Sequence, residues 1–123
     1  MKTEKEKKEI TYSDFVKALA KSGNIIKEEL TAEDAHILHM AVGISGEAGE
    51  LLDTIKKSAI YRKEYDVENI IEELGDLEFY MEGMRQAFTL NREDIIQANA
   101  DKLMVRYSKG YSDKQAQNRA DKV

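Results

Sequence analysis

The sequence predicts an all-α fold, a helical bundle with four main helices, from three observations. The chain contains no proline, so long helices can run without interruption. A polar signature typical of a helix N-cap recurs along it, and apolar residues between these signatures keep helical spacing. At 123 residues the chain has the length of one domain. We therefore expect a single helical domain over 1–123, in which 1–10 and 112–123 form flexible or intersubunit arms.

The N-cap signatures place the starts of the predicted helices. Thr11, Thr31 and Asn91 each precede an aspartate by three residues, a spacing that resembles an N-cap with an acid at the third helical position. Asp66 is a plausible cap for the remaining helix. These signals predict helices over 12–29, with Gly23 as the point where the first would break, and over 32–58, 67–89 and 92–109, with Gly110 as a stop.

Apolar residues within each predicted helix recur three or four positions apart, which is typical of a helix with one buried face. They are Phe15 and Leu19; Ile37, Ala41, Ile44, Ala48, Leu51, Leu52 and Ile55; Ile70, Leu74, Leu77, Met81 and Met84; and Ile95, Ala98 and Leu103. Gly43, Gly46 and Gly49 interrupt the second helix at every third residue, each costing up to about 1 kcal/mol relative to alanine. They indicate either a tight helix crossing or access for a ligand.

Composition excludes several classes of protein. The chain has no cysteine, which rules out disulfides, thiolate metal sites and cysteine nucleophiles. No stretch reaches the roughly 18 apolar residues of a membrane span, and the first nine residues lack the apolar core of a signal peptide, so we expect a cytoplasmic protein without a membrane partner. The net charge of −5 argues against nucleic acid as a partner.

Two short acidic pairs carry most of the functional information: Glu47-x-x-Glu50 and Glu73-x-x-Asp76. Residues three apart in an α-helix share a face, so each pair points two carboxylates in one direction. The midpoint between the pairs falls close to Tyr61, where the helical pattern breaks. If the two helices fold back on each other there, Glu47 comes level with Asp76 and Glu50 with Glu73. Four carboxylates then meet across one seam.

Such a cluster favours a bound cation, because neighbouring carboxylates raise one another's pKa values and oppose joint ionisation. The residues three and four positions from each acid include no lysine or arginine. Carboxylate oxygens suit hard cations, so we predict that Glu47, Glu50, Glu73 and Asp76 bind Mg²⁺, with Mn²⁺ as the alternative. One such pair alone is common on solvated helices, but two pairs at mirrored distances from one turn favour a site.

A polar stripe on the fourth predicted helix is a candidate phosphate-binding surface. Asn99, Lys102 and Arg106 fall at positions i, i+3 and i+7, so an amide and two cations share one face. Arginine and lysine in such a stripe can grip phosphate oxygens. A solvated basic face is the alternative interpretation.

Two further side chains are candidates for substrate binding. Lys57 lies two turns past Glu50 and either contributes to phosphate binding or pairs with Asp53 one turn away. His39 precedes Glu47 by eight residues, which puts it near the same helix face. It either reaches a base or sugar pocket or is a partly buried structural histidine.

Residues 43–51, followed by 72–77, resemble the motif of the MazG-like, all-α nucleoside triphosphate pyrophosphohydrolases. The stretch from Asn99 through Lys102 to Arg106 is similar to the family's following helix, so the resemblance covers roughly 35–111. Gly46 stands where the family motif often has a further leading glutamate. The N-terminal helix, which commonly helps to define the base pocket in this family, shows no match.

The resemblance implies Mg²⁺-dependent hydrolysis of a (deoxy)nucleoside triphosphate to the monophosphate and pyrophosphate. Glu47, Glu50, Glu73 and Asp76 would hold the ion, and Glu47 or Glu50 would orient or deprotonate the attacking water. The resemblance also implies a homodimer or homotetramer in which helices of two subunits complete each site, with interface candidates that a core role would explain equally well: Tyr80, Met81 and Met84.

The sequence also allows two alternative functions. One is a non-enzymatic helical metal-binding or regulatory module, which predicts metal-dependent stability without turnover. The other is a pyrophosphohydrolase of a phosphoribosyl-nucleotide or other nucleotide derivative, which predicts poor activity on common triphosphates.

Overall fold

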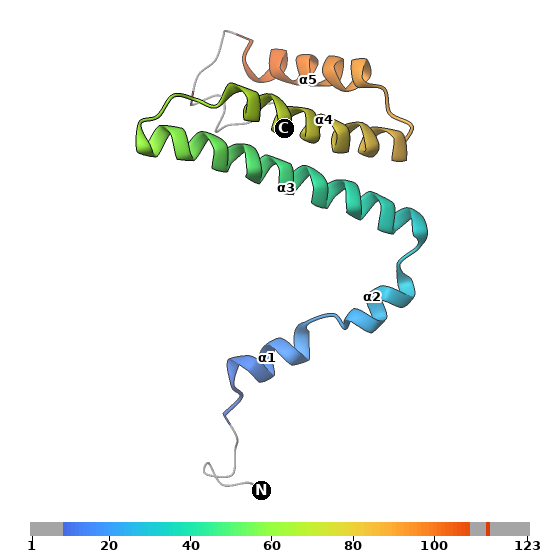
Figure 1. The fold of residues 1–123 in the computed structure, drawn as a ribbon. Helices are drawn as coiled ribbons and strands as arrows, with labels where there is room; N and C mark the ends of the chain where they lie inside the picture. The colour runs from blue at the N-terminus through green and yellow to red at the C-terminus, as the bar shows by residue number, and fades with distance from the viewer. Residues whose placement is uncertain (1–8, 109–112, 114–123) are drawn as a thin grey trace, which may run out of the picture. The chain divides into compact units, whose positions relative to one another are not determined.

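The computed structural model describes residues 9–108 and 113, and within them the fold is all-α, as predicted (Figure 1). Five helices follow one another: α1 Tyr12–Leu19, α2 Gly23–Glu29, α3 Ala32–Tyr61, α4 Val67–Ala87 and α5 Arg92–Arg106. Among these residues, no helix combines the length and the apolar character that crossing a bilayer demands. The chain divides into two compact units at Asp34–Ala35, and the prediction of one domain over 1–123 stays a prediction.

The first unit contains α1 and α2, so the helix predicted over 12–29 is interrupted, next to the Gly23 that the sequence offered as its break. The break comes before Gly23, because the Ser22 hydroxyl accepts a hydrogen bond from the Asn24 backbone N–H (3.2 Å) and starts a second helix. Lys21 and Glu29 form an ion pair at 2.6 Å. The apolar side chains of α1 are exposed, including Phe15, which stacks on Tyr12 with ring centroids 6.5 Å apart.

The predicted N-caps are confirmed at all four positions. Thr11 and Asp66 accept hydrogen bonds from backbone N–H groups three residues on, both at 3.1 Å. Asn91 accepts from the two N–H groups of the first turn of α5. At α3 the bonding is reciprocal: Thr31 accepts from the Asp34 N–H (3.0 Å) while the Asp34 carboxylate accepts from the Thr31 N–H (3.1 Å).

The predicted helix ends were less accurate. α3 continues past 58 to Tyr61, and α4 stops at Ala87 rather than 89. Both helices end in a left-handed residue, Arg62 after α3 and Thr89 after α4, each with φ of 53°. The following N–H then bonds back to the carbonyl five residues earlier, which satisfies a carbonyl at the helix end. α5 stops at Arg106 instead of 109, and the predicted stop at Gly110 lies outside the described residues.

α3 and α4 form an antiparallel hairpin whose seam is tight at two glycines. An added Cβ at Gly43 would overlap the Tyr80 ring, and one at Gly83 would overlap the Met40 sulfur. The sequence left a tight crossing and ligand access open for the glycines of α3, and the structure answers this position by position. Gly43 is a crossing point, whereas nothing lies within 4 Å of a Cβ at Gly46 or Gly49.

The connection from α4 to α5 is fixed by a network around Arg85. The Arg85 side chain is only 8% exposed, and its guanidinium donates hydrogen bonds to Glu82 (2.8 Å) and Glu78 (2.7 Å). These carboxylates hold its pKa above the usual range. Arg92, the first residue of α5, lies 3.9 Å from the same Glu78 carboxylate. α5 runs beside α4 (Figure 1).

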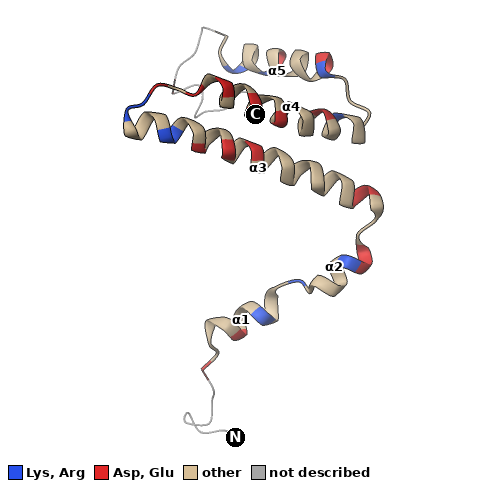
Figure 2. Ribbon diagram, in the orientation of Figure 1, with Lys and Arg blue, Asp and Glu red and all other residues tan. Residues whose placement is uncertain are grey.

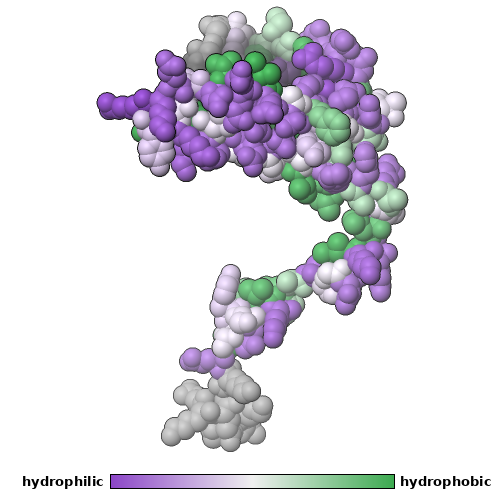
Figure 3. Space-filling view, in the orientation of Figure 1, coloured by the Kyte–Doolittle hydropathy of each residue, from purple (hydrophilic) through white to green (hydrophobic). Residues whose placement is uncertain are grey.

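The described residues bury little apolar surface within a single chain. Met40 is the one buried apolar side chain among them, while predicted inner-face positions such as Leu52, Leu74 and Leu103 are 66%, 49% and 38% exposed. Apolar patches are visible on the molecular surface (Figure 3). A helical unit of this size normally needs a larger core to fold stably.

Gly43→Ala should lower the melting temperature, because the new methyl group would displace the Tyr80 ring. Overpacking of this kind costs about 1–3 kcal/mol, offset by up to about 1 kcal/mol of improved helix propensity. The matched control is Gly46→Ala, where the added methyl meets open space and stability should stay level or rise. Thermal unfolding of both variants checks this, and equal melting temperatures would contradict the tight crossing.

Candidate metal and substrate site

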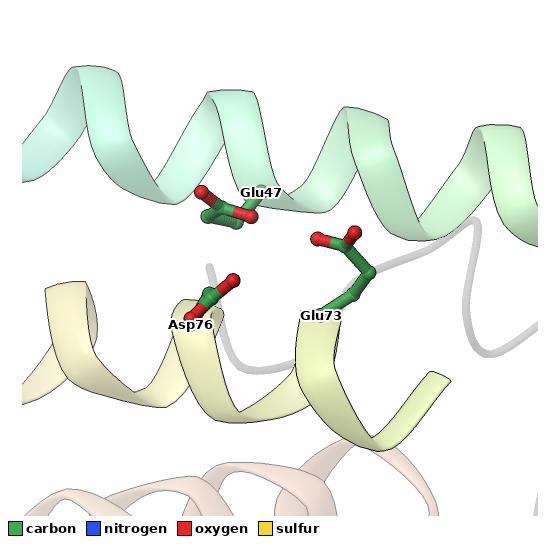
Figure 4. A group of neighbouring side chains, drawn as sticks. All are labelled: Glu47, Glu73 and Asp76. Carbon is green, nitrogen blue, oxygen red and sulfur yellow. The ribbon is translucent and has the colours of Figure 1, made fainter. Parts of the chain in front are cut away.

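The acidic pairs meet across the α3–α4 seam. One carboxylate oxygen from each of Glu47, Glu73 and Asp76 lies within 4.8 Å of the other two. Figure 4 shows Glu47 reaching from α3 toward Glu73 and Asp76 on α4, with the three carboxylates converging between the helices. Glu47 and Glu73 are half-buried and Asp76 is exposed. We call these three residues the acidic cluster.

The acidic cluster holds one carboxyl group in an unusual state. Its neighbours raise the pKa of Glu73 from about 4.5 to about 7, first through a hydrogen bond shared with Glu47, then through desolvation and the charges of Glu47, Glu50 and Asp76. Within the described residues, the buried Glu73 Oε2 atom has no hydrogen-bond partner. A buried oxygen without a donor is costly, so the site is incomplete as a purely structural feature.

The donor set of the acidic cluster fits a hard divalent cation. Three carboxylate oxygens converge, and Glu73 also carries a buried oxygen, Oε2, for which a cation would be a partner. Mg²⁺ and Mn²⁺ prefer oxygen ligands, and a few carboxylates completed by water and phosphate oxygens are a usual arrangement for Mg²⁺. Three of the four metal ligands predicted from the sequence thus lie together, and their role in binding a metal stays a prediction.

Glu50 is placed differently from the other three predicted ligands. The contacts of Gly43 with Tyr80 and of Thr54 with Asn69 keep the predicted register of the two helices, but the close group consists of Glu47, Glu73 and Asp76 without the Glu50 carboxylate. The Glu50 charge still contributes to the raised pKa of Glu73. Glu50 is exposed and lines a cavity that Glu73 also borders. It therefore lies at the boundary between the acidic cluster and an open space.

We call the cavity that Glu50 and Glu73 line the larger cavity. It has a volume of about 670 Å³ and lies in the hairpin between the acidic cluster and the α3–α4 turn. Acidic residues gather on the facing parts of the two helices here (Figure 2). Its lining is mostly polar and comes from both helices and the turn: Glu50, Asp53, Thr54, Lys57, Ser58, Tyr61, Lys63, Glu64, Asp66, Asn69 and Glu73.

Hydrogen bonds order the wall of the larger cavity. The Asn69 side-chain amide donates to the Thr54 hydroxyl at 2.6 Å, which joins α4 to α3. The Ser58 hydroxyl donates to the Glu64 carbonyl at 3.2 Å. Thr54 and Ser58 are buried. Sequence reasoning missed these residues, although a signal existed: Thr54 and Ser58 continue the face of Glu50 at four-residue intervals, and Asn69 precedes Glu73 by four.

Two predicted substrate-binding residues on α3 have protein partners in the structure. Lys57 forms an ion pair with Asp53 at 2.9 Å, the pairing that the sequence offered as one alternative. Their hydrogen bond raises the pKa of Lys57 and lowers that of Asp53. His39 lies against the Tyr80 ring, with centroids 5.9 Å apart in an edge-on arrangement. Lys57 lines the larger cavity.

The predicted phosphate-binding stripe lies on α5, beside the helix that carries Glu73 and Asp76 (Figure 1). Asn99 and Lys102 are exposed, whereas Arg106 is half-buried at the last residue of α5. The Arg106 guanidinium lies 5.9 Å from the centre of the Tyr107 ring. The role of these three residues in substrate binding stays a prediction.

The raised pKa of Glu73 predicts a pH-dependent stability for the metal-free protein. A proton bound to Glu73 stabilises the folded state, so this contribution is fully present below about pH 4.5 and is lost as the pH rises through about 7. Melting curves in the presence of a chelator should show the wild type losing stability across that interval relative to Glu73→Gln, whose neutral amide does not titrate. A constant difference between the two proteins would contradict this assignment.

The sequence matches one known protein family. The sequence model of the MazG nucleotide pyrophosphohydrolase domain matches residues 36–110, more than half of the chain. The matched range contains α4, α5 and all four predicted metal ligands. Searches of curated proteins and of solved structures found no match.

Proposed function

Because the chain belongs to the MazG nucleotide pyrophosphohydrolase family, we propose that it hydrolyses a nucleoside triphosphate to the monophosphate and pyrophosphate with Mg²⁺ or Mn²⁺. The observation that carries the proposal is the acidic cluster, with three carboxylate oxygens within 4.8 Å of one another beside a cavity of about 670 Å³. A cation site next to a cavity of this size suits a metal-dependent reaction of a small phosphorylated molecule.

The acidic side chains have two different roles in the proposed reaction. Glu47, Glu73 and Asp76 would hold the divalent ion, which when bound neutralises phosphate charge and makes a coordinated water more acidic. Glu50 lies outside the close group and lines the cavity, so it is the better placed of the two candidate bases to orient the attacking water and accept its proton.

In the proposed reaction each bond that forms is matched by one that breaks, and the proton released by the water has an acceptor on the protein. The water oxygen forms a new bond to phosphorus, the bridging P–O bond between the α and β phosphates breaks, and pyrophosphate leaves. The proton released by the water passes to Glu50. Phosphoryl transfer depends mainly on positioning and charge neutralisation, so a few carboxylates and cations are a sufficient apparatus. Lys102 and Arg106 on α5 are the proposed cations for the phosphate chain, with Asn99 beside them.

We also propose that the protein functions as a homo-oligomer, either a dimer or a tetramer. The support is the scarcity of buried apolar side chains within one chain and the exposure of helix-face residues such as Leu52, Phe79 and Met104. A second copy packing on these faces would supply the missing core. Light scattering on the purified chain measures the oligomeric state, and a stable monomer would contradict the proposal.

The direct test is to incubate the purified protein with Mg²⁺ and a panel of ribo-, deoxy- and modified nucleoside triphosphates and to identify the phosphate product. We expect pyrophosphate and nucleoside monophosphate in equal amounts, and no activity in a chelator. Stepwise orthophosphate release would exclude the proposed reaction. A metal-dependent rise in melting temperature without turnover of any nucleotide would point instead to a non-enzymatic metal-binding module.

A further inference from the structure

The hydrogen bond between Asn69 and Thr54 lies one helical turn from the acidic cluster. Thr54 follows Glu50 by four residues on α3, and Asn69 precedes Glu73 by four on α4, so each shares a helix face with its acid. The Asn69 amide nitrogen donates to the Thr54 hydroxyl at 2.6 Å, and Thr54 is only 8% exposed. A buried partner at this distance fixes the Asn69 amide, which borders the larger cavity and whose carbonyl oxygen is a hydrogen-bond acceptor.

The charge of the larger cavity decides which part of a nucleotide it suits. Five carboxylates and two lysines line it, a formal excess of three negative charges. One of the lysines, Lys57, is already paired with Asp53 at 2.9 Å. A triphosphate chain would meet like charge here, which is strongly unfavourable. The uncharged nucleoside, whose hydroxyl and amino groups donate hydrogen bonds to carboxylate and amide oxygens, fits this lining.

The other cavity of the hairpin is a weaker candidate for the nucleoside. It has a volume of about 240 Å³ and is bordered by His36, Met40 and Phe79 among others, but it shares no residue with the acidic cluster. Pockets for small molecules usually measure about 300–1,000 Å³, a range that includes the larger cavity and not the smaller one. The larger cavity also borders Glu73 itself.

We propose that the larger cavity binds the nucleoside of the substrate and that Asn69 hydrogen-bonds a sugar hydroxyl there, with Thr54 as its positioning residue. This inference rests on the proposed function and extends it to substrate recognition. The sugar is attached directly to the phosphate chain, so with the phosphates at the acidic cluster it is the first group to enter the cavity. Asn69 is one helical turn from Glu73, a rise of about 5.4 Å, and is thus placed for the sugar rather than for the more distant base.

The first experiment is steady-state kinetics of Asn69→Ala with Mg²⁺ and the four deoxynucleoside triphosphates. The KM should rise about fivefold to tenfold, the effect of losing one hydrogen bond, while kcat changes little. Inhibition by inorganic tripolyphosphate, which has the charged chain without a nucleoside, should stay unchanged. The matched control is Gln97→Ala, which removes an exposed amide on α5 that donates a hydrogen bond to Asp101, and it should behave as wild type.

The second experiment removes the hydroxyl from the substrate instead of the amide from the protein. Wild type should bind 2′,3′-dideoxynucleoside triphosphates as weakly as Asn69→Ala binds the deoxy forms, and Asn69→Ala should lose nothing further with the dideoxy forms. Thr54→Val keeps the side-chain shape but removes the hydroxyl that orients Asn69, so it should raise KM partially. Thr54→Ser should restore it.

The outcomes separate this inference from the proposed function. An Asn69→Ala variant that loses tripolyphosphate inhibition in step with substrate binding would place the phosphate chain in the cavity and overturn the inference. A variant with unchanged KM would also overturn it. If the wild type hydrolyses no triphosphate, calorimetry with the four deoxynucleoside monophosphates still decides: Asn69-dependent binding supports the inference while the proposed reaction fails, and absence of binding ends both.

Discussion

Glu73→Gln should lower kcat/KM by about 100-fold or more while leaving the helices intact. The substitution keeps the size of the side chain but removes a charge from the acidic cluster, and it converts a proposed metal ligand into a weaker one. It also relieves the repulsion that raises the pKa of Glu73, so the metal-free variant should melt at a higher temperature than the wild type at neutral pH.

The chain offers a matched control for this prediction at the preceding residue. Glu72 is exposed on α4 and lies outside the acidic cluster, so Glu72→Gln makes the same chemical change one position away. It should retain near-normal activity and show no added stability without metal. Pyrophosphate release and melting curves with and without Mg²⁺ compare the two variants. Near-normal turnover by Glu73→Gln, or its unfolding, would remove Glu73 from the proposed metal site.

The sequence correctly predicted the features in which a side chain acts within its own helix. Asp66 and Asn91 cap helices at the expected positions because capping depends on residues within one turn. The i, i+3 spacing of Glu73 and Asp76 put both carboxylates on one face, and the turn near Tyr61 brought Glu47 opposite them. The prediction that these residues bind a metal rests on residue type alone.

Features that depend on three-dimensional packing were not accessible in the same way. α3 and α4 are followed by left-handed Arg62 and Thr89, where a glycine is usual, so no glycine marked the last residue of either helix. Gly43 meets the Tyr80 ring and Thr54 meets Asn69, contacts between residues far apart in the chain that keep Glu50 in register with Glu73. Helical register alone does not fix the rotamer of a side chain, so it could not predict that the Glu50 carboxylate stays outside the close group.

The exposure of the apolar helix faces is another feature that the sequence pattern did not predict. The periodicity of Leu74 and Leu103 predicted faces that avoid water, but in one chain these residues are 49% and 38% exposed. A pattern of apolar residues predicts that a face is covered without saying what covers it. The proposed second copy supplies a cover that no single-chain pattern can specify.

Lys102→Ala and Arg106→Ala should each reduce kcat/KM about tenfold or more if α5 holds the phosphate chain as proposed. A charge-assisted hydrogen bond to a phosphate is worth roughly 1.5–3 kcal/mol, and a loss of about 1.4 kcal/mol is already tenfold. Helix stability should change little at Lys102, since alanine is the best helix former and Lys102 is exposed.

The control for these variants lies at the other end of the same helix. Arg92 is 60% exposed and lies 3.9 Å from Glu78, so Arg92→Ala removes a cation from α5 without touching the predicted stripe, and kcat/KM should stay near the wild-type value. Tripolyphosphate inhibition adds a readout specific to the phosphate chain: it should weaken in Lys102→Ala and Arg106→Ala but not in Arg92→Ala. If all three variants retain wild-type kinetics and inhibition, the stripe is a solvated basic face and the phosphate chain is bound by the acidic cluster and its cation alone.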